Sequence, residues 1–115
     1  MGNDKENLFV YGTLLEPEVL KAVIGRVANG VEDKLKGYKK SQMEIDGEPY
    51  PILVAAEDEV VAGKVLHLTL EELAELDEYE SEVYIRRQVV LESRIRAWVY
   101  IPKSDVRSRD SIKRS

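Results

Sequence analysis

The sequence predicts an α+β fold in which a small mixed, barrel-like β-sheet carries two main helices. Three observations predict it. The apolar run of residues 8–11, which ends at Gly12, indicates a buried strand and a turn. The sequence TLEE at residues 69–72 is typical of the capped start of a helix. Most of the remaining chain consists of β-branched or alternating segments separated by turn residues, which is typical of a curved or barrel-like sheet.

The first helix is predicted to follow the first strand almost directly. Pro17 suits the first position of a helix, because its missing N–H group would have no partner there. Apolar residues then repeat at helical spacing through residues 19–24, and Gly25 fits a C-terminal cap. These signals predict a short amphipathic helix that packs on the sheet.

The strands are predicted from apolar runs and from the turns that separate them. A strand is expected near residues 36–44, with a turn at 46–47. Residues 50–68 are expected to form two strands around an acidic turn at 57–59. Residues 83–102 are expected to form a hairpin.

The second helix is predicted to carry an acidic side chain on its buried face. At about 100° per residue, Leu70, Leu73 and Leu76 fall in one apolar stripe. Glu80 falls in the centre of this stripe and Asp77 lies close to it, whereas the other acidic residues of the helix point to the solvent.

This position predicts a raised pKa for Glu80. Burial, the like charge of Asp77 one turn earlier and the negative end of the helix dipole all disfavour the charged form of the carboxyl. A weakly acidic carboxyl suits general acid/base catalysis near neutral pH. A structural alternative stays open, in which Glu80 pairs with Arg86 or Arg87 or turns into the solvent.

Composition limits the classes of function. The chain of 115 residues is predicted to form one domain over residues 1–102. It contains no cysteine and one histidine, so we expect no disulfide, no thiolate chemistry and no histidine-rich metal site. The net charge of −5 argues against a nucleic-acid partner, and the absence of a long apolar run or signal-peptide pattern argues for a cytoplasmic protein that does not enter a membrane. Residues 103–115 are polar and basic, and are expected to form a disordered tail.

Two segments resemble signatures of a known family. The sequence LFVYGTLLEPEVLKAVIGR, residues 8–26, is similar to the opening of the gamma-glutamylcyclotransferase-like family, whose first strand ends in Tyr-Gly-Thr-Leu or a close variant. The sequence LDEYESEVYIRRQVVL, residues 76–91, resembles the second signature of that family. The resemblance covers about residues 8–101 and is closest to the small, single-domain, avirulence-induced-protein-like branch.

The resemblance implies a gamma-glutamylcyclotransferase-like fold and a reaction. Family members of this type cyclise a small gamma-glutamyl amine, amide or peptide to 5-oxoproline and release the amine, without a cofactor. By position, Glu80 would be the general acid/base. The loop that would hold the substrate comprises Tyr11, Gly12, Thr13 and Leu14.

Several alternatives stay open from the sequence. The turn at Gly12 is either a plain strand-to-helix connection or a loop whose backbone N–H groups bind an anion, and with Glu80 downstream we favour the second. Tyr84 and Arg86 follow Glu80 on one strand face, where Arg86 could support the site or form a surface ion pair. Ser81 stands where the family often has glycine, so the alternative function is a non-catalytic small-ligand-binding or protein-interaction module that keeps the pocket.

The face of the last strand supplies two further candidates. Trp98 and Tyr100 share this face and are expected in the core or in a pocket wall. The small gamma-glutamyl substrate is the partner that the sequence implies, and the choice between monomer and dimer is left open.

Overall fold

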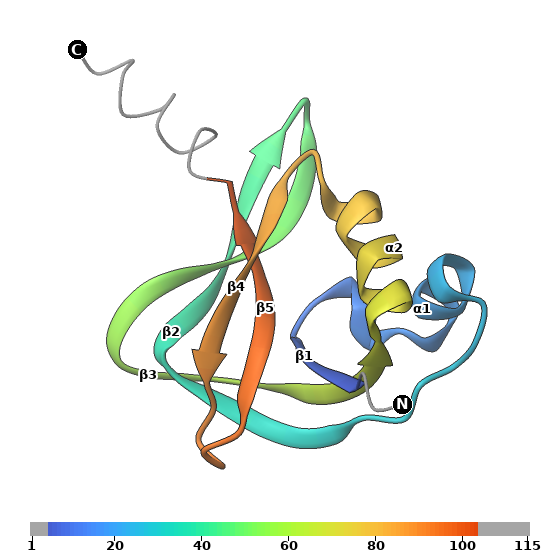
Figure 1. Ribbon diagram of the computed structural model, residues 1–115. Helices are drawn as coiled ribbons and strands as arrows, with labels where there is room; N and C mark the ends of the chain where they lie inside the picture. The colour runs from blue at the N-terminus through green and yellow to red at the C-terminus, as the bar shows by residue number, and fades with distance from the viewer. Residues whose placement is uncertain (1–4, 104–115) are drawn as a thin grey trace.

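The computed structural model describes residues 5–103, which form a curled five-stranded sheet with two α-helices beside it (Figure 1). The elements, in chain order, are β1 (Lys5–Val10), a short 3₁₀ turn η1 (Thr13–Leu15), α1 (Pro17–Ile24), β2 (Val31–Ile45), β3 (Glu48–Thr69), α2 (Leu70–Glu80), β4 (Tyr84–Val90) and β5 (Arg96–Pro102).

The sheet is mixed and curls into a half-barrel. Its strand order is β2-β3-β1-β5-β4, with β1 and β5 parallel and the other neighbours antiparallel. The backbone N–H of Glu92, just after β4, donates to the carbonyl of Lys34 in β2 at 2.8 Å, so the two outer strands meet at one end. Helices α1 and α2 pack together on one side of the sheet (Figure 1). The predicted α+β class with a barrel-like sheet is confirmed.

Strand β1 lies at the centre of the sheet, and its last three residues, 8–10, are buried on both faces. Leu8 and Val10 pack in the cluster beneath the helices, whereas Phe9 and Tyr11 pack in a second cluster on the opposite face. A strand buried on both faces has no polar face, which explains why the sequence shows a continuous apolar run there. Tyr11, the last residue of the run, packs in the second cluster and immediately precedes the turn.

Both helices begin and end as the sequence predicts. The hydroxyl of Thr69 accepts from the N–H of Glu72 at 3.1 Å, and the Glu72 carboxylate accepts from the N–H of Thr69 at 3.0 Å, which completes the capping box of α2. Pro17 is the first residue of α1, and Gly25 ends it in a left-handed conformation with φ of 82°.

The prediction of two strands around residues 57–59 is wrong, because β3 is a single strand of 22 residues. The pairing of β2 with β3 shifts register here, from Val60 to Ala55, and forms an irregular bulge. Asp58 has φ of 71°, and Gly37 on the facing strand has φ of 88°. A bulge uses the polar residues and positive φ angles that also mark a turn, but it bends the strand without reversing it.

The prediction that Leu70 joins the buried stripe of α2 is also wrong. Leu70 is 53% exposed, whereas Leu73 and Leu76 are buried. Leu70 is the first residue of the helix, ahead of the turns that pack on the sheet.

The predicted tail begins at the end of the described chain. The backbone N–H of Lys103 donates to the carbonyl of Val83 at 2.8 Å. Residues 104–115, which make up the rest of the predicted tail, lie outside the described residues. Between residues 5 and 103, no helix is long and apolar enough to cross a membrane.

Candidate active site

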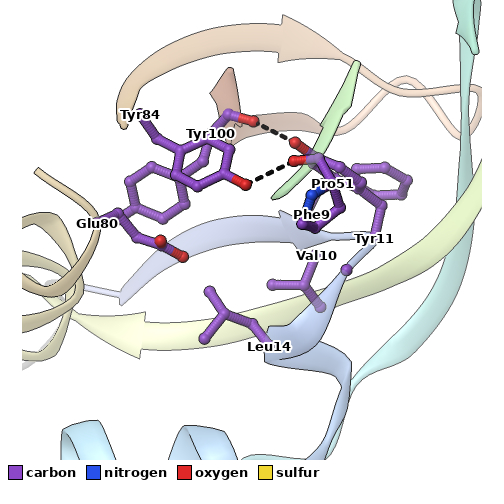
Figure 2. Close-up of a pocket in the computed structure, with 9 residues that line it drawn as sticks. Phe9, Val10, Tyr11, Leu14, Pro51, Glu80, Tyr84 and Tyr100 are labelled. Atoms are coloured by element: carbon purple, nitrogen blue, oxygen red, sulfur yellow. Dashed lines mark hydrogen bonds between the residues drawn. The ribbon is translucent and has the colours of Figure 1, made fainter. Parts of the chain in front are cut away.

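A small cavity of about 30 Å³ lies where β1 ends, between the sheet and the end of α2 (Figure 2). It brings together four of the five residues that the resemblance pointed to, together with Tyr84. Glu80 is the only acidic or basic side chain among the lining residues, and the others are mainly apolar or aromatic. The lining residues are Phe9, Val10, Tyr11, Gly12, Leu14, Pro51, Glu80, Tyr84 and Tyr100.

A wider groove of about 460 Å³ adjoins this cavity. Three residues line both spaces, namely Pro51, Glu80 and Tyr84. The groove is otherwise formed by residues 49–50 at the start of β3 and by residues 78–83 around the end of α2. Glu80 therefore lies at the junction of the small cavity and the wider groove.

Glu80 is the last residue of α2, and its helical phase turns it toward the core. Figure 2 shows its carboxyl pointing into the space between the tyrosine rings and the side chains of Val10 and Leu14. Within residues 5–103, no hydrogen bond or ion pair reaches this carboxyl. Burial without a compensating donor raises the pKa of Glu80 from its ordinary value of 4.5 to about 7.

Arg86 does not pair with Glu80. Its guanidinium holds Asp77 through two hydrogen bonds, of 2.6 Å from Nε to Oδ1 and 2.9 Å from Nη2 to Oδ2. It also lies over the ring of Trp98, with its carbon 4.3 Å from the ring centroid. The charge of Asp77 is therefore matched by Arg86. The raised pKa of Glu80 follows from burial and not, as the sequence had suggested, from Asp77 as well.

Two tyrosine side chains in the wall of the cavity are anchored by hydrogen bonds from their hydroxyl groups to backbone carbonyls (Figure 2). Tyr11 donates to the carbonyl of Tyr100 at 2.7 Å, and Tyr84 donates to the carbonyl of Pro51 at 2.6 Å. Burial is the first cause that raises the pKa of both phenols. Both side chains therefore stay neutral near pH 7. Because each hydroxyl already donates its one hydrogen bond to a carbonyl, these tyrosines fix the shape of the cavity.

The loop after β1 is a tight turn packed against β3. The N–H of Leu15 donates to the carbonyl of Gly12 at 2.9 Å and closes η1. A Cβ atom on Gly12 would lie 3.0 Å from Cγ of Pro51, so this position favours glycine. Thr13 begins η1, and its side chain is outside what the structure describes.

The residue after Glu80 does not need to be glycine. Ser81 has φ of −62° and ψ of −21°, which is ordinary right-handed helical backbone. Its hydroxyl donates to the carbonyl of Glu78 at 3.0 Å. The serine therefore fits the end of α2 without strain, and the departure from the family pattern does not disturb the position of Glu80.

The sequence had placed Tyr100 in the core or a pocket wall, but it gave no indication of Pro51 in the site. Pro51 reaches the cavity because the start of β3 meets Tyr84, whose hydroxyl donates to the Pro51 carbonyl. That contact depends on the tertiary arrangement of strands that are 33 residues apart in the sequence. No local pattern around Pro51 could have indicated it.

Comparison with known proteins assigns the chain to a family. A family model described as gamma-glutamyl cyclotransferase, AIG2-like, matches residues 8–115. The AIG2-like protein C of Arabidopsis thaliana is 38% identical over 89 residues, which cover 76% of this chain and 51% of that protein. The chain thus spans about half the length of this curated relative.

Solved structures show the same architecture. A solution structure from Arabidopsis thaliana superposes with a TM-score of 0.74 at 30% identity, covering 89% of this chain and 71% of the other. A structure named gamma-glutamyl cyclotransferase superposes with a TM-score of 0.68 at 18% identity, covering 86% of this chain and 67% of the other. At that identity the second comparison shows a shared fold.

Proposed function

Because the chain belongs to the gamma-glutamyl cyclotransferase, AIG2-like family, we propose that it cyclises the gamma-glutamyl group of a small amine, amide or peptide. The products would be 5-oxoproline and the free amine. The observation that carries this proposal is the Glu80 carboxyl, which lies in a mainly apolar cavity with a pKa of about 7 beside the loop at the end of β1.

The reaction needs proton transfer from the protein but no protein nucleophile, because the substrate supplies the attacking nitrogen. The α-amino nitrogen of the substrate forms a bond to its own γ-carbonyl carbon, and the bond from that carbon to the leaving nitrogen breaks. One proton leaves the attacking amine and one is delivered to the departing amine. A single carboxyl can accept the first proton and donate the second.

Glu80 has the properties that this exchange requires. A general acid/base works best when its pKa is close to the working pH, because both protonation states are then populated. A pKa of about 7 meets this condition, whereas an exposed glutamate near 4.5 would be a poor acid at neutral pH. The raised pKa is a consequence of the mainly apolar lining of the cavity.

The turn after β1 would supply the donors for the developing oxyanion. The first N–H groups of a helical turn find no acceptor within the turn, and in η1 the first internal bond is donated by Leu15. The N–H groups of residues 12–14 precede it. Fixed backbone donors of this kind stabilise negative charge that appears on the carbonyl oxygen in the transition state.

The cavity is smaller than a glutamyl group, so the side chains around it would have to shift when a substrate binds. A volume of about 30 Å³ has room for about one or two water molecules and not for a glutamyl group. The adjoining groove is much larger, and the hydrogen bond from Tyr84 to the carbonyl of Pro51 spans the boundary between them. We infer that the glutamyl part lies against Glu80 at this boundary and that the leaving amine extends into the groove.

The proposal is tested by incubating the purified protein with a panel of gamma-glutamyl compounds and quantifying 5-oxoproline by chromatography. We expect time-dependent 5-oxoproline with at least one gamma-linked compound. The matched control is the α-linked glutamyl derivative of the same amine, which cannot cyclise by this route. Absence of product over the whole panel would contradict the proposal, and binding without turnover would favour a ligand-binding module.

A further inference from the structure

The end of α2 is fixed to the sheet through Asp77, one turn before Glu80. Arg86 supplies two of the hydrogen bonds to its carboxylate. Tyr100 supplies the third, from its hydroxyl to Oδ1 at 2.8 Å. Arg86 and Tyr100 face each other in the ladder between β4 and β5, so the register of this hairpin places both donors under the same carboxylate.

Tyr100 also contacts the other half of the site. Its backbone carbonyl accepts the 2.7 Å hydrogen bond from the hydroxyl of Tyr11, which Figure 2 shows across the cavity. Tyr11 immediately follows β1 and opens the loop of residues 11–14. Tyr100 itself is 5% exposed and lines the cavity. One residue is thus bonded to the helix that carries Glu80 and to the start of the candidate substrate loop.

We propose that Tyr100 is a positioning residue that sets the distance between the Glu80 carboxyl and the loop of residues 11–14. This inference rests on the proposed function, since it concerns the geometry of the same reaction. The side chain of Tyr100 fixes α2, and its backbone fixes Tyr11, so a shift of either partner changes the separation between acid/base and donors.

The expected effect follows from the position of Glu80 at a helix terminus. Terminal helical turns fray unless tertiary contacts hold them. Without the Tyr100 hydroxyl, the Asp77 carboxylate would keep only its two hydrogen bonds from Arg86 among the described residues. A displacement of about 1 Å from the reactive geometry can reduce a rate on the order of 10²-fold.

The test compares Tyr100→Phe with Tyr38→Phe as a matched control. Tyr38 lies in β2, half-buried against the cluster on the opposite face of the sheet, and it lines neither the cavity nor the groove. In Tyr100→Phe we expect kcat to fall by about 10-fold or more with KM changed less than about 2-fold, because orientation and not binding is lost. In Tyr38→Phe both constants are expected to match wild type.

A second measurement reports on Glu80 without any substrate. Carboxyl resonances followed by NMR over pH 4–9 are expected to give a midpoint for Glu80 nearer to 4.5 in Tyr100→Phe than in wild type, because a shifted helix end exposes the carboxyl. The midpoint is expected to be unchanged in Tyr38→Phe. Several titratable and charged groups lie around Glu80. They are Tyr11 after β1, Tyr50 of β3, Asp77 and Glu78 of α2, Glu82 of the following turn, Tyr84 and Arg86 of β4, and Tyr100 of β5.

Two outcomes would overturn the inference. If Tyr100→Phe only lowers the melting temperature and leaves both kcat and the Glu80 midpoint unchanged, then Tyr100 has a structural role alone. An equal loss in Tyr38→Phe would show that the effect is not specific to the contact between Tyr100 and Asp77. If wild type produces no 5-oxoproline, the proposed function fails, whereas the NMR comparison still decides whether Tyr100 positions Glu80.

Discussion

Replacing Glu80 with glutamine is expected to lower the rate of 5-oxoproline formation by about 10²–10⁴-fold, the usual loss when a general acid/base is removed. Glutamine keeps the length of the side chain and can fill the same space in the cavity, but it cannot exchange a proton. The measurement is kcat/KM for the best gamma-glutamyl compound of the panel. A variant that turned over at the wild-type rate would show that the carboxyl is not the acid/base.

Thermal melting of Glu80→Gln against wild type serves as the control for this variant. The pKa of Glu80 in the folded protein, about 7, lies above the ordinary value of 4.5, so the folded state binds the proton more tightly than the unfolded state. The charged carboxyl therefore destabilises the fold increasingly as the pH rises from about 4.5 through about 7. We expect Glu80→Gln to melt at or above wild type at pH 8, with the difference shrinking toward pH 4.

Replacing Gly63 with alanine is expected to destabilise the protein by about 1–3 kcal/mol or more, through overpacking. Gly63 lies in β3, and a Cβ atom there would be 2.3 Å from the backbone oxygen of Val10 and 2.8 Å from Cζ of Phe9. Because a backbone oxygen of the central strand cannot move aside as a side chain can, the end of β1 has to shift. That end leads directly into Tyr11, so we expect activity to fall together with stability.

The matched comparison is Gly12→Ala. There the new Cβ would meet only the ring of Pro51, at 3.0 and 3.4 Å, and that ring can yield by a few tenths of an ångström. Urea unfolding of both variants should therefore show a smaller loss in Gly12→Ala than in Gly63→Ala. A Gly63→Ala protein within about 0.5 kcal/mol of wild type would contradict the view that β1 and β3 are this closely packed.

Local signals in the sequence were sufficient for much of the fold. The apolar run of β1, the capping box of α2 and the Pro17 and Gly25 boundaries of α1 are determined by nearby residues, and the structure has them where they were expected. The acidic residues 57–59 were misleading, because a bulge and a turn use the same residue types. What distinguishes them is the interrupted pairing with β2 around Gly37, which is a non-local property.

The candidate site also has some features that the local sequence predicts and others that depend on the tertiary structure. The inward position of Glu80 follows from helical phase, and burial then raises its pKa, so both could be anticipated from residues 70–80. The pairing of Arg86 with Asp77 could not, because it depends on how α2 lies over the hairpin of β4 and β5. The double contact of Tyr100 involves a backbone carbonyl, which no side-chain pattern can indicate.

The most direct test of the central claim is the titration of the Glu80 carboxyl in the ligand-free wild-type protein. The resonance can be assigned by comparison with Glu80→Gln and followed by NMR from pH 4 to pH 9. Burial in a mainly apolar cavity without a hydrogen-bond donor predicts a midpoint of about 7. A midpoint at or below 4.5 would mean that Glu80 is a solvated or paired anion, and it would contradict its assignment as the acid/base of a cyclotransferase.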